Sequence, residues 1–160
     1  MARAFIAIGS NLQQPRIQVT QAFGLLADLP QTRLIKRSSL YRTAPVGYDN
    51  QPDFINAVAE VETSLEPLQL LNELLALESR QGRERPFPNA PRVLDLDLLL
   101  YNDTMMQTPE LTLPHPRMHV RGFVMLPLAE IAPDIEIPGL GRVAALAAQC
   151  QDPGVEKLAD

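Results

Sequence analysis

Alternating leucine and aspartate residues between positions 94 and 98 constrain the fold of this chain more than any other stretch of its sequence. The segment reads Val93-Leu94-Asp95-Leu96-Asp97-Leu98-Leu99-Leu100-Tyr101, and its two-residue period is that of a β-strand. One face of this strand is therefore expected to carry leucines alone, at positions 94, 96, 98 and 100. The opposite face would carry Asp95 and Asp97, together with Val93, Leu99 and Tyr101.

The two carboxylates on that second face need either solvent or a positively charged partner. Side by side on an apolar strand, Asp95 and Asp97 repel each other and are costly to remove from water. A hard divalent cation offsets this cost, and Mg²⁺ binds carboxylate oxygens, waters and substrate phosphates. A metal site is therefore one interpretation of the pair, and a half-exposed strand with a solvated aspartate face is the other.

Composition limits the classes to which the chain can belong. Its 160 residues are 46% hydrophobic, which suits one domain over residues 1–160 with a sizeable core. The net charge of −5 and the lack of a basic stripe argue against binding to nucleic acid. No apolar run approaches the length of a membrane span, and the single cysteine, Cys150, fits a reducing compartment. We expect a cytoplasmic monomer that binds neither nucleic acid nor a membrane.

The order of expected elements predicts the architecture. Apolar patterns indicate strands over residues 4–8, 34–43, 54–62 and the aspartate segment, with helices after Pro15, from Pro67 to about Gly82, over 124–131 and over 143–149. The first six of these elements follow the order βαββαβ of a ferredoxin-like α+β fold, in which both helices cover one face of a mainly antiparallel sheet. The C-terminal additions are expected to cover the other face and complete a layered α/β sandwich.

Two polar side chains in these elements are candidates for ligand contacts. Glu78 shares a helical stripe with Leu71, Leu74 and Leu75, so its carboxylate lies on or beside the inward face. It either meets a partner there or reaches water at the end of the helix.

Phe54 and Asn56 point to the same face of their strand, which suits a flat heterocycle that stacks on the ring and pairs with the amide. The alternative is a core phenylalanine beside an asparagine that ties down a neighbouring loop.

Basic side chains cluster around a loop with three prolines and around His115. They are Arg80, Arg83, Arg85, Arg92, Arg117 and Arg121. Guanidinium groups near paired carboxylates favour a polyphosphate ligand, whereas a solvated basic loop is the alternative for any one of them. The chain contains no P-loop and no kinase-type glycine loop, so a nucleotide would be held differently. His115, between two prolines, either contacts phosphate or serves only as a turn residue.

Short motifs in this order and spacing resemble the 6-hydroxymethyl-7,8-dihydropterin pyrophosphokinase family over nearly the whole chain. They are Ala7-Ile8-Gly9-Ser10-Asn11-Leu12, Ser39-Leu40-Tyr41-Arg42-Thr43, Gln51-Pro52-Asp53-Phe54-Ile55-Asn56-Ala57, Gln81-Gly82-Arg83, Pro91-Arg92-Val93-Leu94-Asp95-Leu96-Asp97, Leu113-Pro114-His115-Pro116 and Arg121-Gly122-Phe123. The resemblance implies transfer of pyrophosphate from ATP to the pterin hydroxymethyl group, with release of AMP. It also implies two Mg²⁺ ions held by Asp95 and Asp97.

The resemblance further implies two substrate sites. The pterin site maps to Thr43, Pro45, Val46, Phe54, Asn56 and Phe123. The ATP site maps to Glu78, Arg83, Arg92, Leu98, Thr112, His115 and Arg121. Arg83 and Arg92 would act in catalysis, with Asp95 and Asp97, by neutralising phosphate charge in the transition state.

One loop departs from the family pattern. Many members carry Arg-Trp-Gly-Pro-Arg before the aspartate strand, whereas this chain has Arg85-Pro86-Phe87-Pro88-Asn89-Ala90-Pro91-Arg92 and no tryptophan. Phe87 is a candidate replacement for the missing ring. We expect residues 82–91 to form a mobile lid that closes over ATP.

Two other functions fit parts of the sequence. Ferredoxin-like sheets with paired aspartates also occur in nucleotidyltransferases that act on nucleic acid, although the net acidity opposes this. A small-molecule regulatory domain with a solvated aspartate pair is a third hypothesis. Release of AMP from ATP that requires Mg²⁺ and the pterin alcohol would separate the three.

Overall fold

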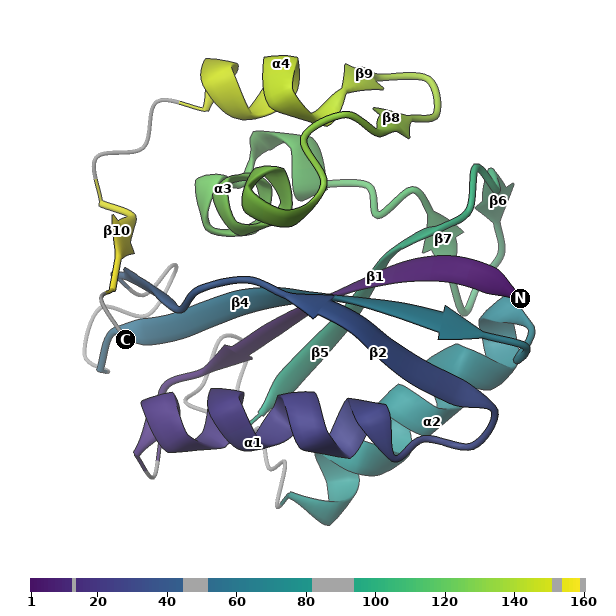
Figure 1. The fold of residues 1–160 in the computed structure, drawn as a ribbon, viewed down its shortest axis with the longest axis horizontal. Coiled ribbons are helices and arrows are strands. Elements are labelled where there is room, and N and C mark those ends of the chain that lie inside the picture. Colours follow the sequence, from purple (N-terminus) through teal and green to yellow (C-terminus); the bar gives the residue numbers. More distant parts are fainter. Residues whose placement is uncertain (13, 45–51, 82–93, 151–153, 159–160) are drawn as a thin grey trace.

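An antiparallel sheet forms the middle layer of the molecule (Figure 1). The computed structural model of the chain describes residues 1–12, 14–44, 52–81, 94–150 and 154–158. The sheet contains β1 (Ala2–Ser10), β2 (Thr32–Arg37), β3 (Tyr41–Thr43), β4 (Phe54–Thr63), β5 (Asp95–Tyr101) and β10 (Glu156–Lys157). Its order is β10-β3-β4-β1-β5, with β2 also paired to β4, and every pairing is antiparallel. This is the strand arrangement expected of a ferredoxin-like fold.

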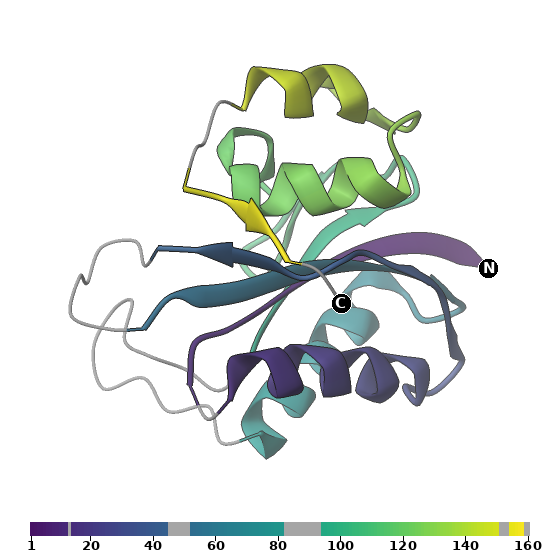
Figure 2. The same ribbon diagram turned by 60° about the vertical axis from the view of Figure 1, so that its left-hand side comes forward.

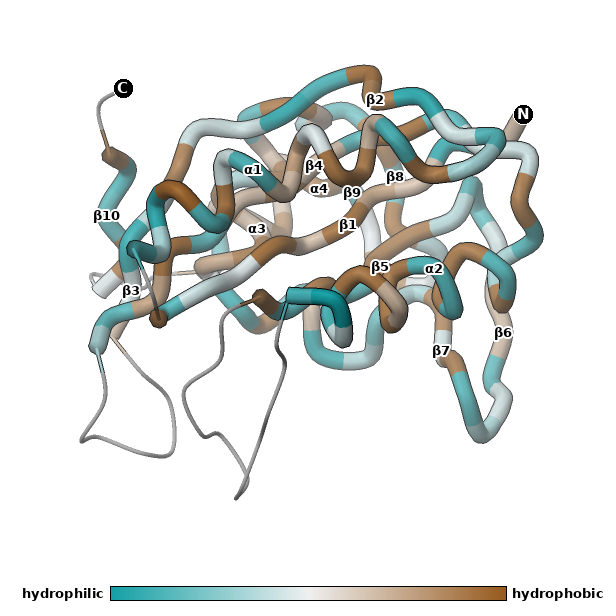
Figure 3. The backbone as a smooth tube through the Cα atoms, turned by 90° about the horizontal axis from the view of Figure 1, so that it is seen from below, coloured by the Kyte–Doolittle hydropathy of each residue, from teal (hydrophilic) through white to brown (hydrophobic). Residues whose placement is uncertain are grey.

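Helices α1 (Pro15–Ala27) and α2 (Pro67–Arg80) cover one face of this sheet (Figures 1 and 2). Seen from their side, α1 alternates hydrophilic and hydrophobic residues, as a helix with one buried face does (Figure 3). It buries the apolar stripe expected from its sequence, which includes Phe23 and Leu26. A capping box between Glu66 and Gln69 starts α2. The first hydrophobic core lies between these helices and the sheet.

The C-terminal part of the chain covers the other face and completes the layered sandwich (Figure 2). It contains a short 3₁₀ turn (Met118–Val120), α3 (Gly122–Ile131) and α4 (Val143–Gln149). Small hairpins of β6 (Met106–Gln107) with β7 (Thr112–Leu113), and of β8 (Glu136–Ile137) with β9 (Gly141–Arg142), link these elements. None of the helices in the described ranges combines the length and apolarity that crossing a membrane requires.

The strand expected over residues 34–43 is in fact two strands, β2 and β3. Arg37 pairs with Ala59, but Tyr41 pairs with Asn56, so one extra residue lies between the two registers. At the break, the Ser38 side chain takes a ladder position, because its Oγ accepts from the backbone N–H of Val58 at 2.9 Å. Serine hydroxyls compete with the backbone in this way. The bulge separates a long edge strand from the three-residue strand that borders the site.

Because of a second bulge, the last residues of β5 do not lie on the faces expected from strict alternation. Ile6 pairs with Leu98 and Phe5 with Leu100, so Leu99 is an extra residue. Leu94, Leu96 and Leu98 lie in the first core as expected, but Leu99 and Leu100 both lie in the second core. Tyr101 then returns to the first face, where its hydroxyl donates to the carbonyl of Leu65 at 2.5 Å. The two-residue period holds only up to the bulge, and this includes both aspartates.

Candidate active site

Two cavities meet at the paired aspartates of β5. The first, of about 430 Å³, lies on the sheet face that α3 only partly covers. The second, of about 470 Å³, lies between β5, α2 and the segment around β7. Asp95, Asp97 and Arg121 line both cavities. Groups bound in the two cavities would therefore meet beside two carboxylates and one guanidinium.

Small residues on β1 open the sheet face in front of the carboxylates. Ala7 lies opposite Asp97, and Gly9 lies opposite Asp95 on one side and Asn56 on the other. A Cβ atom at Gly9 would lie 3.1 Å from the Asn56 side-chain oxygen, closer than an ordinary contact. Glycine at this position therefore lets the Asn56 amide lie against β1 and keeps the floor of the first cavity open.

The first cavity combines two aromatic rings with a fixed carboxamide. Phe54, Asn56 and Phe123 line it, whereas Ile55 belongs to the first core, as strand alternation predicts. The Asn56 amide nitrogen donates to the Thr43 hydroxyl at 2.9 Å, and Asn56 is 6% exposed. The Thr43 hydroxyl therefore orients the amide. Asn56 thus ties down β3, and its side chain also lines the cavity.

Arg121 connects the two cavities at the start of α3. Its guanidinium carbon lies 5.7 Å from the centre of the Phe123 ring, within the range of a cation–π contact. The backbone of Arg121 is the N-cap of α3, so the beginning of this helix positions both side chains. Arg121 therefore brings a positive charge to both of the cavities that Asp95 and Asp97 line.

In the second cavity, Glu78 faces inward and does not reach bulk water. It is 2% exposed, and its Oε2 accepts from the backbone N–H of Leu96 at 2.7 Å. This contact joins α2 to β5 between the two aspartates. Of the two alternatives left open by the sequence, the buried one is confirmed.

His115 also lines the second cavity and is held by backbone contacts. The backbone N–H of His115 donates to the carbonyl of Leu99 at 2.9 Å. The ring Nδ1 of His115 accepts from the backbone N–H of Arg117 at 3.2 Å. Burial lowers the pKa of His115, and the charges of Arg121 and Arg117 lower it further against the opposing effect of Asp95. A neutral ring that accepts at Nδ1 carries its proton on Nε2 and donates from there.

The pair Asp95 and Asp97 suits a metal ion that takes its other ligands from water and from a substrate. Within the described ranges, no group of three or more His, Cys, Asp or Glu side chains is arranged to hold a metal ion. Asp95 and Asp97 offer carboxylate oxygens only, and both are half-buried at the junction of the cavities. Such a pair fits Mg²⁺, which keeps few protein ligands and takes the rest from water and phosphate.

Most candidate site residues are brought together in these cavities. Thr43, Phe54, Asn56 and Phe123 line the first, and Glu78, Leu98, Thr112, His115 and Arg121 line the second. Pro45, Val46, Arg83 and Arg92 lie outside the described residues, as does the expected lid over 82–91 with Phe87.

Other lining residues had no assigned role in the sequence analysis. They include Ala7, Gly9 and Val120 in the first cavity, and Leu71, Leu75 and the segment 108–111 in the second. Ala7 and Gly9 belong to the motif Ala7-Ile8-Gly9-Ser10-Asn11-Leu12. Their small side chains, next to polar residues, could have indicated a cavity there. The segment 108–111 has no periodic pattern that could have revealed it.

The layered fold, with two cavities that share an acidic edge, defines an α+β protein with room for two ligands side by side. Comparison with known proteins identifies the class more closely. Residues 5–133 match the family described as 7,8-dihydro-6-hydroxymethylpterin-pyrophosphokinase (HPPK), and the chain belongs to this family.

Curated relatives extend this similarity over almost the full chain. The 2-amino-4-hydroxy-6-hydroxymethyldihydropteridine pyrophosphokinase of Pseudomonas aeruginosa is 44% identical over 98% of this chain and 96% of its own length. The protein of the same name from Haemophilus influenzae is 44% identical over 99% of both chains.

Solved structures agree on the fold. A Plasmodium falciparum HPPK-DHPS structure matches 98% of this chain with a TM-score of 0.77 at 14% identity. This chain spans only 47% of that longer chain.

Proposed function

We propose that the chain transfers the β,γ-pyrophosphoryl group of ATP to the hydroxymethyl oxygen of 6-hydroxymethyl-7,8-dihydropterin, a step of folate biosynthesis. The oxygen–phosphorus bond to the β-phosphorus forms as the bond to the α-phosphate oxygen breaks, so AMP leaves and the hydroxyl proton is released. Family membership supports this reaction. The single structural observation that carries it is the junction of two cavities at Asp95 and Asp97.

The first cavity is the proposed pterin site. Phe54 and Phe123 offer faces for the flat ring, and the oriented Asn56 amide pairs with groups on its edge. Thr43 holds the amide. Pro45 and Val46 are proposed to complete the pocket, on the basis of the family resemblance alone.

The second cavity is the proposed ATP site. Glu78 and Thr112 offer oxygen acceptors for the adenosine part, next to the apolar side of Leu98. His115 and Arg121 donate to phosphate oxygens, as the Nε2 proton and the guanidinium allow. Arg83 and Arg92 are proposed to neutralise charge that develops on the phosphates. Most of the acceleration then comes from positioning and charge neutralisation.

Asp95 and Asp97 are proposed to hold two Mg²⁺ ions between the cavities. When bound, the metal supplies charge neutralisation of the triphosphate and polarises the β-phosphorus towards attack. The strand contributes fixed positions for both carboxylates, since each lies opposite a small residue of β1. The Arg121 guanidinium, which lines the same two cavities, is proposed to balance part of their charge.

We also propose a cytoplasmic monomer with one domain over residues 1–160. The need for ATP and the lone Cys150 fit a reducing, nucleotide-containing compartment. Sedimentation of the pure protein measures the oligomeric state.

Release of AMP is the decisive test of the reaction. We expect AMP from ATP only when both Mg²⁺ and the pterin alcohol are present, and Asp95→Ala or Asp97→Ala should lower turnover on the order of 10²-fold or more. Both variants should still fold, which a cooperative thermal transition would show.

Asp103→Ala, in an exposed turn after β5, is the matched control and should keep full turnover. Full activity of either aspartate variant across a range of Mg²⁺ concentrations would reject the metal assignment. AMP release without the pterin alcohol would reject the proposed acceptor.

A further inference from the structure

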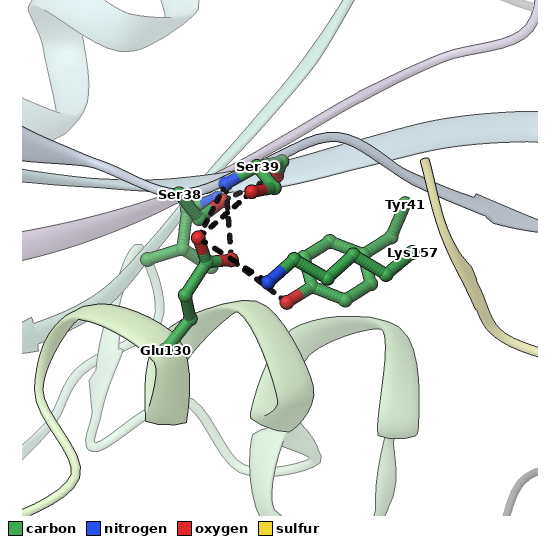
Figure 4. A network of polar contacts seen from close by, with 6 residues as sticks. Ser38, Ser39, Tyr41, Glu130 and Lys157 are labelled. Carbon is green, nitrogen blue, oxygen red and sulfur yellow. Dashed lines mark hydrogen bonds and ion pairs between the residues drawn. The ribbon is translucent and has the colours of Figure 1, made fainter. Parts of the chain in front are cut away.

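The carboxylate of Glu130, on α3, accepts hydrogen bonds from residues at and just after the break between β2 and β3 (Figure 4). The Glu130 carboxylate accepts from the backbone N–H of Ser39 at 3.0 and 3.1 Å and from the Ser39 hydroxyl at 2.8 Å. It also accepts from the Tyr41 hydroxyl at 2.7 Å, and the Lys157 ammonium lies 3.9 Å away. We call these contacts the Glu130 cluster. It joins α3, β3 and β10.

The cluster holds the strand that orients the Asn56 amide. Tyr41 pairs with Asn56 in the sheet, and two residues later Thr43 accepts the amide hydrogen bond of Asn56. β3 has only three residues and follows a bulge, so its ladder with β4 is short. Glu130 supplies the partner that the Ser39 N–H lacks within a regular ladder, and so fixes the strand where the ladder ends.

The opposite end of α3 carries the other wall of the first cavity. Phe123 lies in the first turn of α3 and Glu130 in its last turn, so about 10 Å of helix separates them. Pro127 lies between them, and α3 continues through it with Val124, Met125, Leu128 and Ile131 buried in the second core. The contacts of Glu130 with Ser39 and Tyr41 therefore act together with this core to fix the gap between Phe123 on the helix and Asn56 on the sheet.

The electrostatics of the cluster favour one protonation pattern. Burial works against ionisation of Glu130, but hydrogen bonds from Tyr41 and Ser39 and the charge of Lys157 outweigh it and lower the pKa of the carboxyl. Burial, with the nearby carboxylate, raises the pKa of the Tyr41 hydroxyl, which therefore remains a donor.

We propose that Glu130 is a positioning residue for pterin binding, which sets the width of the first cavity by clamping α3 to β3. The inference depends on the proposed assignment of that cavity to the pterin. Glu130 itself does not line either cavity, so it acts through Phe123 and Asn56 and touches no substrate. The second cavity takes most of its walls from α2, β5 and the β7 region and only Arg121 from the start of α3, so ATP binding should depend on the clamp less than pterin binding does.

Calorimetric titration separates these two effects. Glu130→Gln keeps the size of the side chain but replaces one accepting oxygen by a donor, and it should weaken pterin binding to the analogue-loaded enzyme about 10-fold. The affinity for a non-hydrolysable ATP analogue should fall clearly less, because Arg121 alone joins α3 to the second cavity. Tyr41→Phe removes one bond of the same cluster and should produce a smaller loss in the same direction.

Glu62→Gln is the matched control, because Glu62 is an ion-paired carboxylate of β4 far from the first cavity and should leave both affinities unchanged. Unchanged pterin affinity in Glu130→Gln and Tyr41→Phe, with normal effects of Asn56→Ala and Phe123→Ala, would overturn the clamp alone. Equal losses of pterin and analogue binding would also overturn it, since they indicate general damage. If Asn56→Ala and Phe123→Ala also bind pterin normally, the pocket assignment fails and the clamp fails with it.

Discussion

At the scale of single residues, the absence of a side chain matters as much as the presence of one. Gly9→Ala would place a methyl group 3.1 Å from the Asn56 oxygen, while Thr43 holds the same amide from its nitrogen. The amide cannot turn away without losing that bond. We expect weaker pterin binding with little change in binding of an ATP analogue, measured by calorimetry.

Gly24→Ala is the matched substitution for this test. A Cβ atom at Gly24 meets nothing within 4 Å, and the residue lies inside α1. Alanine in a helix interior is favoured over glycine by about 0.5–1 kcal/mol, so this variant should be slightly more stable and should bind pterin normally. Normal pterin binding by Gly9→Ala as well would show that the cavity floor tolerates a methyl group.

Substitution of Asn56 tests whether a polar side chain of the first cavity contributes to pterin binding. Asn56→Ala leaves the Thr43 hydroxyl and edge groups of the pterin without a partner in a buried site, at a cost of about 1–3 kcal/mol in pterin binding. Removing a stacked ring in Phe123→Ala should cost a similar amount, with base–aromatic stacking as the nearest analogue. The same titration measures both, and wild-type affinity in the two variants would contradict the pterin assignment.

At the scale of elements, the three-residue strand β3 depends on its neighbours. β10 covers its outer edge, where the N–H of Leu158 donates to the carbonyl of Leu40 at 2.9 Å and the Leu158 side chain is buried. Deleting residues 156–160 should therefore loosen β3, speed the exchange of its amide protons and lower pterin affinity. Deleting only residues 159–160 is the control, and equal exchange rates in both truncated chains would rule out a role for β10.

The long elements followed from their sequence patterns, whereas the breaks between them did not. α1 buries the expected stripe and α2 begins at Pro67 as expected, because a 3.6-residue period accumulates over several turns. The short helix over 143–149 also has the expected bounds. The break at Ser38 depends on one hydroxyl that replaces a ladder partner. Strands of two residues, such as β10, carry no period at all.

At the scale of the whole molecule, the Glu130 cluster ties the α3 layer to the sheet, and its ionisation links stability to pH. The folded state lowers the Glu130 pKa below the ordinary carboxyl value of 4.5, so the unfolded state binds protons first as the pH falls. The contribution is therefore fully present above pH 4.5 and is lost as the pH falls through the lower folded pKa.

Denaturant unfolding of the wild-type protein and Glu130→Gln measures this contribution. The difference between their free energies of unfolding should be largest near neutral pH and should shrink below pH 4.5. The pKa of His115 is also lowered in the folded state. Both proteins contain His115, so its pH-dependent contribution to stability cancels in the difference. A difference that stays constant from neutral to acid pH would mean that the Glu130 pKa is the same in the folded and unfolded states.

Local period and residue type were enough to predict several features of this protein. Alternation placed Asp95 with Asp97 and Phe54 with Asn56, and element order gave the ferredoxin-like sheet with helices on one face. The tertiary structure alone decided what depends on residues distant in the chain. It placed Leu99 in a bulge opposite β1, buried Glu78 against the N–H of Leu96, and brought Glu130 onto Ser39. Each of these depends on how one element lies against another, and the local pattern of a single element does not contain that information.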